Sequence, residues 1–291
     1  MKEEEIPVAG DNSVSWDQVI SPRRSLFDLH LKEIWRYRDL LKMLVRRDFV
    51  TIYKQTILGP LWLFIQPVFT AIIYMVIFAR VANISTEGIP PVLFYLGGIS
   101  IWNYFGICFS RTSGTFDANK HIFGKVYFPR LVSPLSVVIV ELFKFLIQFL
   151  LFIAVLVFYL VKGAEIHVNA YALLTPLLLV LMAGIGMGFG MIVSSLTTKY
   201  RDLQFLMGFI IQLWMYATPI IYPISFVPEP YRDYLKWNPI APIVETYKYG
   251  FFGTGTFSWD GLLYSAVFMI LLLFLGVLVF NRTEKSFMDT I

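Results

Sequence analysis

Charged side chains that could do chemistry are scarce in the apolar part of this 291-residue chain. Glu141 and Lys144 are the one charged pair inside a predicted membrane span, three residues apart and so on one helical face. At mid-bilayer each charge alone would cost about 2.5–3.5 kcal/mol. Pro134 precedes Glu141 by about 10 Å of helix. We therefore expect the pair near one membrane surface, where long side chains reach water, with a proton relay as the alternative.

No spacing in the sequence matches a catalytic or metal site. The three histidines are His30, His121 and His167. They are scattered and lack metal-ligand spacing, and neither a nucleophile elbow nor an H-E-x-x-H motif is present. Gly124-Lys125 is followed by Val126, and Asn119 stands where a phosphate-binding P-loop needs glycine. We predict that the chain is not an enzyme and carries no catalytic residue, metal or cofactor of its own.

The composition predicts an all-α integral membrane protein. Hydrophobic residues make up 57% and charged residues 15% of the chain, and the mean hydropathy is +0.66, whereas soluble proteins hold about 25% charged residues. A bilayer core of about 30 Å needs about 20 apolar residues. Six stretches meet that need, near 57–79, 89–110, 135–161, 171–197, 203–223 and 261–280.

The polar N-terminal segment predicts an amphipathic helix that lies flat on the inner leaflet. Wound as a helix, its cationic residues from Lys32 to Arg46 gather opposite an apolar side from Ile34 to Ile52. We expect no cleavable signal peptide, because the start is acidic and the first apolar run comes late. The predicted organisation is a flexible cytosolic N-terminus (1–24), the amphipathic interfacial helix (25–56), a six-span transmembrane domain (57–285) and a cytosolic tail (286–291).

Positive charges predict the orientation. Eighteen Lys and Arg residues fall on the side that includes both termini and five on the other, which places both termini in the cytosol of a multi-pass protein of the cytoplasmic (inner) membrane. The net charge of +4 then reflects topology and anionic lipid, with no nucleic-acid partner. The single cysteine, Cys108, cannot form an internal disulfide.

Three regions depart from a plain pattern of spans and loops. In the cytosolic turn 111–133, Phe116, Lys120 and Phe123 share one helical face, which indicates either a short helix offered to a cytosolic partner or a plain connector. The external stretch 218–259 carries six prolines among many aromatics. It indicates short re-entrant helices or an aromatic anchoring belt.

The third region is the glycine series 184–190. Phe189 occupies the third glycine position of a G-x-G-x-x-G loop, so a nucleotide site is rejected. The pairs Gly184/Gly188 and Gly186/Gly190 instead have the spacing that lets helix backbones approach closely.

Several motifs together resemble the membrane subunits of type-2 ATP-binding-cassette exporters, in the branch that exports cell-surface polysaccharides such as O-antigen, capsule or teichoic acid. The first is Arg46-Arg47-Asp48-Phe49 with Tyr53-Lys54, Leu58-Gly59-Pro60-Leu61-Trp62 and Pro67. The others are Phe128-Pro129-Arg130 before Pro134 and the series Ala217-Thr218-Pro219, Tyr222-Pro223, Val227-Pro228, Tyr231-Arg232, Trp237-Asn238-Pro239 and Pro242. The resemblance covers about residues 25–285.

The resemblance implies a permease that moves a lipid-linked polysaccharide as a homodimer with two separate ATPase subunits, which bind the ATP and Mg²⁺. It implies a coupling helix that contacts the ATPase through Phe116, Asp117, Asn119, Lys120, His121 and Phe123. It implies a substrate pathway lined by aromatic residues at Trp62, Phe69, Tyr74, Trp214 and Tyr216. It implies a periplasmic gate at Pro219, Tyr222, Phe226 and Trp237.

Two other classes remain open on the residues alone. An ion-coupled carrier needs inverted repeats and a midplane site, and the sequence has neither an internal repeat nor a central acidic residue. A membrane transferase acting on lipid-linked sugars needs paired carboxylates or a metal cluster. The external loop offers only Glu229, Asp233, Glu245 and Asp260 for that role.

Overall fold

The computed structural model describes residues 31–54, 58–123, 128–200 and 202–287, and within these ranges it contains helices and no strand. The helices are α1 Leu31–Arg36, α2 Arg38–Tyr53, α3 Trp62–Tyr74, α4 Pro91–Ser113, α5 Thr115–Phe123, α6 Val132–Val161, α7 Thr175–Thr197, α8 Leu203–Tyr216, α9 Glu229–Lys236, α10 Ala241–Phe252 and α11 Trp259–Phe287. Short 3-10 segments occur at Gly59–Leu61, Ala170–Leu174 and Ile224–Phe226, and a π-helical segment, Met75–Val81, continues α3.

Five of the six predicted spans are long and apolar enough to cross a bilayer. They are Gly59–Val81, Pro91–Ser113, Val132–Val161, Ala170–Thr197 and Trp259–Thr283. The remaining predicted span, 203–223, contains only the 14-residue helix α8, which is about 21 Å long and shorter than a bilayer core. Its helix ends at Tyr216, just before Pro219 and Pro223, which cannot donate helical hydrogen bonds.

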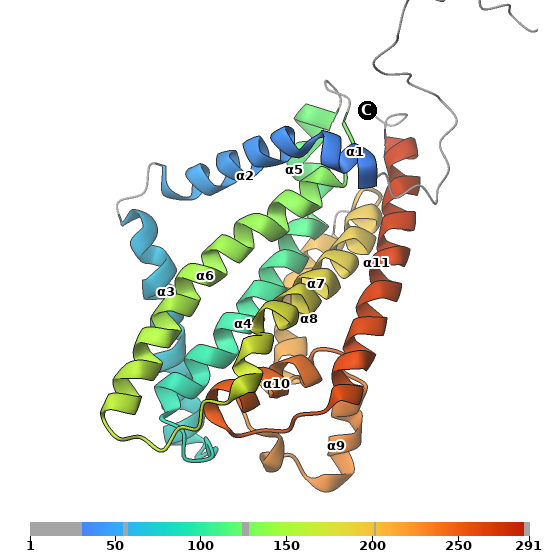
Figure 1. Cartoon of the computed structure of the whole chain (residues 1–291). Coiled ribbons are helices and arrows are strands. Elements are labelled where there is room, and N and C mark those ends of the chain that lie inside the picture. The colour runs from blue at the N-terminus through green and yellow to red at the C-terminus, as the bar shows by residue number, and fades with distance from the viewer. Residues whose placement is uncertain (1–30, 55–57, 124–127, 201, 288–291) are drawn as a thin grey trace, which may run out of the picture.

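The helices alternate in direction between two ends of the molecule (Figure 1). α2, α5 and the last turns of α11 lie at one end, and α2 crosses that end against α6. α9 lies at the opposite end. The cationic N-terminal helix, the short helix α5 and the end of α11 therefore share one side of the bundle.

Helices α4 and α7 form the centre of the bundle. In their most apolar stretches 78% and 72% of the residues are buried, against 11% in the span Gly59–Val81 and 17% in α6. The large apolar cluster around α4 and α7 includes Phe94, Phe105 and Ile185. The outer faces of α3 and α6 are thus left to lipid or to another protein.

The glycine series of α7 explains how this centre packs. Gly184 and Gly188 face α11, whereas Gly186 and Gly190 face α4. A Cβ added at Gly184 would lie 2.3 Å from the sulfur of Met269, a separation that no real structure allows. The prediction that these pairs serve close helix packing is confirmed.

Candidate functional site

The short helix α5 is anchored by its aromatic side chains. Phe116 and Phe123 are buried, and the Phe116 ring stacks on Phe280 of α11 with 4.5 Å between centroids. Phe123 contacts Phe128 and lies under the guanidinium of Arg130. These rings belong to a second apolar cluster that joins α2, α5, α6, α7 and α11.

The polar residues of α5 point outward instead. Asp117, Lys120 and His121 are exposed, and Asp117 and Lys120 form an ion pair at 4.0 Å. Asn119 is half-buried, and its amide donates to the carbonyl oxygen of Thr115 at 3.0 Å. The structure therefore separates Lys120 from Phe116 and Phe123, which the helical periodicity had grouped on one face. Only the polar edge of α5 is accessible to another protein.

A network of charged side chains links α2 to α4 and α6. Arg111, near the end of α4, donates to Glu141 of α6 at 2.7 Å and to Asp48 of α2 at 3.5 Å. Glu141 is buried, and its Oε1 also accepts from Lys144 at 2.7 Å. Arg47 completes the series by pairing with Asp48 at 2.8 Å. The predicted Glu141–Lys144 pair thus exists, and it is part of a network that joins three helices.

This network borders a polar cavity of about 540 Å³ between α2, α4, α5 and α6. Arg47 and Asp48 line one side, and Asp117, Asn119 and Lys120 line another. The conspicuous Arg46-Arg47-Asp48-Phe49 run of the sequence therefore meets the exposed edge of α5 at one place.

The five residues predicted for the substrate pathway fall into two groups. Trp62 and Phe69 of α3 and Tyr216 of α8 expose 52%, 62% and 45% of their surface. Tyr74 and Trp214 instead pack against the central cluster. The Tyr74 hydroxyl reaches the sulfur of Met215 at 3.8 Å, so the C-terminal ends of α3 and α8 lie together. The structure brings Trp62 and Phe69 onto one outward face of α3 and places Tyr74 away from it.

Trp214 is held by a specific hydrogen bond as well as by packing. Its indole N–H donates to Oδ1 of Asn238 at 3.2 Å, and its ring meets Phe105 and Phe189 edge-on. The Asn238 amide in turn donates to the carbonyl oxygen of Ala217 at 3.1 Å and to the hydroxyl of Thr218 at 2.9 Å. Asn238 thereby satisfies the backbone where α8 ends.

The predicted gate residues are divided in the same way. Pro219 is buried, and Tyr222 is half-buried with its hydroxyl donating to the carbonyl oxygen of Tyr216 at 3.0 Å. Phe226 and Trp237 are exposed. The first two residues fix the irregular segment after α8, whereas the last two lie on its outer surface.

A buried lysine holds that irregular segment in place. Lys248 of α10 donates to the carbonyl oxygens of Pro219 and Tyr222, lies 4.4 Å above the ring of Phe94, and pairs with Glu245 at 3.9 Å. Burial lowers the pKa of Lys248 to about 8, and the Glu245 charge opposes that shift. Burial likewise raises the pKa of Glu245. Carbonyl groups freed by the prolines are thus satisfied inside the protein, as non-helical backbone in a membrane protein requires.

Sequence reasoning missed three residues of this structure: Arg111, Asn238 and Lys248. Arg111 and Lys248 had been counted only as loop charges on either side of the membrane. The available signal was the spacing of Glu245 and Lys248, three residues apart in an apolar segment, which repeats the pattern of the Glu141–Lys144 pair. The partners of Arg111 and Lys248 on other elements lie 26–63 residues away in sequence, beyond the reach of any local pattern.

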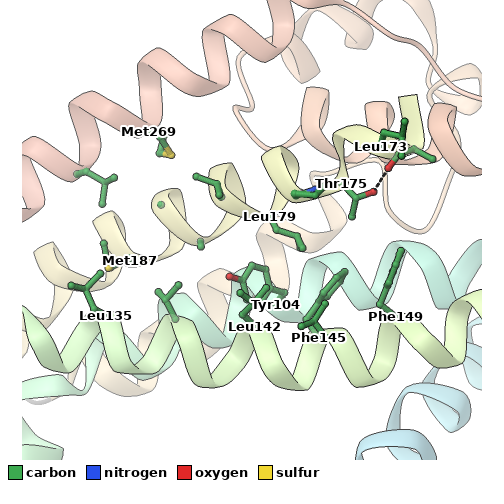
Figure 2. A pocket seen from close by; sticks show the side chains of 18 of the residues that line it. Tyr104, Leu135, Leu142, Phe145, Phe149, Leu173, Thr175, Leu179, Met187 and Met269 are labelled. Carbon is green, nitrogen blue, oxygen red and sulfur yellow. Dashed lines mark hydrogen bonds between the residues drawn. The ribbon is translucent and has the colours of Figure 1, made fainter. Parts of the chain in front are cut away.

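A large apolar cavity of about 850 Å³ separates α6 from α7 (Figure 2). Phe145 and Phe149 of α6 face Leu179 of α7 across it. The hydroxyl of Thr175 is already bonded to the carbonyl oxygen of Ala172 at 2.6 Å. The walls suit hydrocarbon and offer nothing to a nucleotide or a sugar.

Helices of this length and polarity, packed around α4 and α7, define a multi-pass membrane protein. The family model for the ABC-2 type transporter matches residues 39–252, and the chain belongs to that family. The family prediction is thereby confirmed.

Similar proteins carry names from polysaccharide export. The O-antigen export system permease protein RfbA of Klebsiella pneumoniae is 28% identical over 252 residues, covering 86% of this chain and 94% of the relative. RfbA of Myxococcus xanthus is 26% identical over 263 residues, covering 90% and 98%. The polysialic acid transport protein KpsM of Escherichia coli is 25% identical over 254 residues, covering 86% and 95%. These similarities favour an export permease over an ion-coupled carrier or a transferase.

Proposed function

We propose that this chain is the permease subunit of an ATP-driven exporter that moves a lipid-linked cell-surface polysaccharide across the cytoplasmic membrane. The observation that carries the proposal is membership of the ABC-2 type transporter family along 39–252, together with relatives named for O-antigen and polysialic acid transport. The energy comes from a separate ATPase subunit, because the sequence has no phosphate-binding loop. ATP and Mg²⁺ belong to that partner.

The proposed assembly is two copies of this chain with two ATPase subunits. Support comes from the exposed apolar surfaces of α3 and α8, where Phe69, Phe205 and Phe209 expose 62%, 88% and 58% of their surface. Of the α8 residues, only Met207 and Met215 are buried. Such surfaces fit either lipid or a second copy, and the aromatic residues on α3 favour a shared path between copies.

In the proposed topology both termini lie in the cytosol and α8 with its extension makes the sixth crossing. α2 lies on the inner leaflet, and α9 and α10 form the short external helices that dip back into the outer leaflet. The charge asymmetry of eighteen to five supports this orientation. The hydrogen bonds of Asn238 and Lys248 to the backbone after α8 support the placement of that segment at membrane depth.

The proposed coupling runs from the ATPase through the polar edge of α5. A push on Asp117, Lys120 and His121 moves a helix whose aromatic side is packed on α11, so the motion cannot be absorbed by α5 alone. The Arg111 network carries it to α2 and α6. The proposal needs no chemistry from this chain beyond those contacts.

The test is reconstitution with and without the partner. The chain, purified alone, should show no magnesium-dependent ATP hydrolysis. With the ATPase encoded beside it, the complex should hydrolyse ATP and restore surface polysaccharide to cells that lack the exporter. Hydrolysis by the lone, contaminant-free chain, or normal surface polymer in cells without it, would refute the proposal.

A further inference from the structure

A small cavity of about 220 Å³ lies between α3, α4 and α6, and both polar and apolar side chains line it. Three carboxamide side chains face it, one from each helix: Gln66, Asn103 and Gln148. Among the described residues none of these side chains has a hydrogen-bond partner. A carboxamide has two donors and two acceptor positions to satisfy. The cavity therefore presents a set of unpaired donors and acceptors that converge from three helices.

The cavity lies within the membrane-spanning part of the bundle. From the first residue of α6, Glu141 is about 14 Å and Gln148 about 24 Å along the helix, and α6 is a predicted span. Leaving a polar group unpaired in such surroundings costs free energy. Gln66 is exposed and Asn103 and Gln148 are half-buried, so all three side chains are accessible to a ligand that enters the cavity. The cost is recovered when a polar ligand enters.

The lining identifies the chemistry of that ligand. Glu141 and Lys144 also line the cavity, and their charges cancel, so the site does not collect the excess of cations that a phosphate needs. Both cations bonded to Glu141 use Oε1, which leaves Oε2 as an acceptor without a partner among the described residues. Amides and a carboxylate oxygen arranged in this way bind hydroxyl groups.

An aromatic ring completes the site. Trp62 lines the cavity at the outward face of α3, where it exposes 52% of its surface. Gln66 and Phe69 follow four and seven residues later on the same face. On the inner side, Tyr104 and Phe145 pack 5.6 Å apart between centroids and separate this cavity from the apolar one between α6 and α7. The site thus combines carboxamide, charged and aromatic side chains, has room for one sugar ring, and opens toward the aromatic face of α3.

We propose that this cavity is a binding subsite for a single neutral sugar residue of the cargo, with Trp62 as the stacking platform and the three carboxamides and Glu141 as hydroxyl partners. The inference rests on the proposed export of a lipid-linked polysaccharide. It adds, beside Trp62 of the predicted substrate pathway, hydrogen-bonding partners for sugar hydroxyl groups that the aromatic residues alone do not provide. Glu141 would then link an occupied subsite to the network that reaches α2 through Arg111.

The experiment uses the complete exporter in lipid nanodiscs and two probes: a polyprenyl diphosphate that carries one neutral hexose, and the same polyprenyl diphosphate without sugar. The unchanged exporter should prefer the sugar-bearing probe. Asn103→Leu and Gln148→Leu should each reduce that preference about fivefold to tenfold, the equivalent of one or two lost hydrogen bonds, and should leave binding of the bare probe unchanged. Leu150→Met, at an exposed position two residues beyond Gln148 on α6, is the matched control and should change neither.

Protection of a single cysteine gives a measurement that does not depend on the leucine variants folding. In a Cys108→Ala background, Gln66→Cys should be protected from a thiol reagent by the sugar-bearing probe and not by the bare one. Equal protection by both probes, or no protection, would overturn the subsite, as would an unchanged preference in both leucine variants. If the unchanged exporter restores surface polymer while these results are negative, only the subsite fails. If it restores none, the proposed function itself fails.

Discussion

Lys248 shows how one side chain holds the irregular segment after α8 in place. It is almost completely buried. Its ammonium group donates to the carbonyl oxygens of Pro219 and Tyr222, which lie beyond the end of α8. Glu245 lies beside it at 3.9 Å. Removing the lysine therefore leaves two unpaired carbonyl groups and an uncompensated buried carboxylate.

Lys248→Met should accordingly destabilise the folded chain by about 3–5 kcal/mol, the usual effect of removing one partner of a buried ion pair. The double change Lys248→Met with Glu245→Gln should lose less, because the buried negative charge is gone too. Lys236→Met is the control, since Lys236 and its partner Asp233 are both exposed and such pairs contribute about 0–1 kcal/mol. Thermal unfolding followed by size-exclusion fluorescence measures all three. A Lys248→Met melting temperature equal to that of Lys236→Met would contradict this assignment.

At the scale of elements, α5 shows what a helical pattern can and cannot predict. Periodicity placed Phe116, Lys120 and Phe123 on one side of a cytosolic helix, and the helix is present at Thr115–Phe123. Which side turns inward depends on neighbours that are distant in sequence, above all Phe280. Similarly, hydropathy predicted six spans, of which five are helices long and apolar enough to cross a bilayer, and glycine spacing predicted the close packing of α7. The partners of Arg111 and Lys248, and the early end of α8, required the three-dimensional arrangement.

Substitutions on the exposed polar side of α5 and on its buried aromatic side should have different effects. Lys120→Glu combined with His121→Glu should reduce recovery of the ATPase with this chain and reduce export, without lowering the yield of inserted protein, because both residues are exposed. Phe123→Ala should lower that yield, since truncating a buried aromatic costs about 3–5 kcal/mol in soluble cores. Affinity purification of the pair, normalised to permease yield, separates the two effects. Normal recovery and normal export in the double glutamate variant would return α5 to the role of a plain connector.

At the scale of the whole molecule, the orientation in the membrane is open to a direct chemical test. After Cys108→Ala, single cysteines at Asp117 and Lys199 should react with an impermeant thiol reagent only from the cytosolic side. Those at Gly163 and Glu229 should react only from outside. Asp117 is suitable for labelling because its side chain is exposed, whereas the buried Thr115 of the same helix would react poorly from either side. Reaction of Glu229→Cys only from the cytosol would overturn the six-span topology, in which α8 crosses despite its short helix.

The path of the cargo can be tested at the same scale, because the structure divides the five aromatic residues of the predicted pathway into packed and exposed ones. Tyr74 and Trp214 pack within one chain, and Trp214 also bonds Asn238. Alanine at either position should lower the yield of folded complex. Trp62, Phe69 and Tyr216 are exposed in the single chain, so their truncation removes little packing within it.

Alanine at Trp62, Phe69 or Tyr216 should therefore leave complex yield and basal ATP hydrolysis nearly unchanged and slow the export of long polymers, if these rings contact a sliding sugar chain. Surface polymer length, complex yield and ATPase rate, measured together on all five variants, distinguish a contact with cargo from packing and from lipid exposure. Phe158→Ala serves as the control, because Phe158 is an aromatic residue of α6 with 52% of its surface exposed and lies outside the predicted path. If the three exposed positions behave like Phe158→Ala in every measurement, the aromatic path does not run along α3 and α8. The outer residues Phe226 and Trp237 then become the next positions to test.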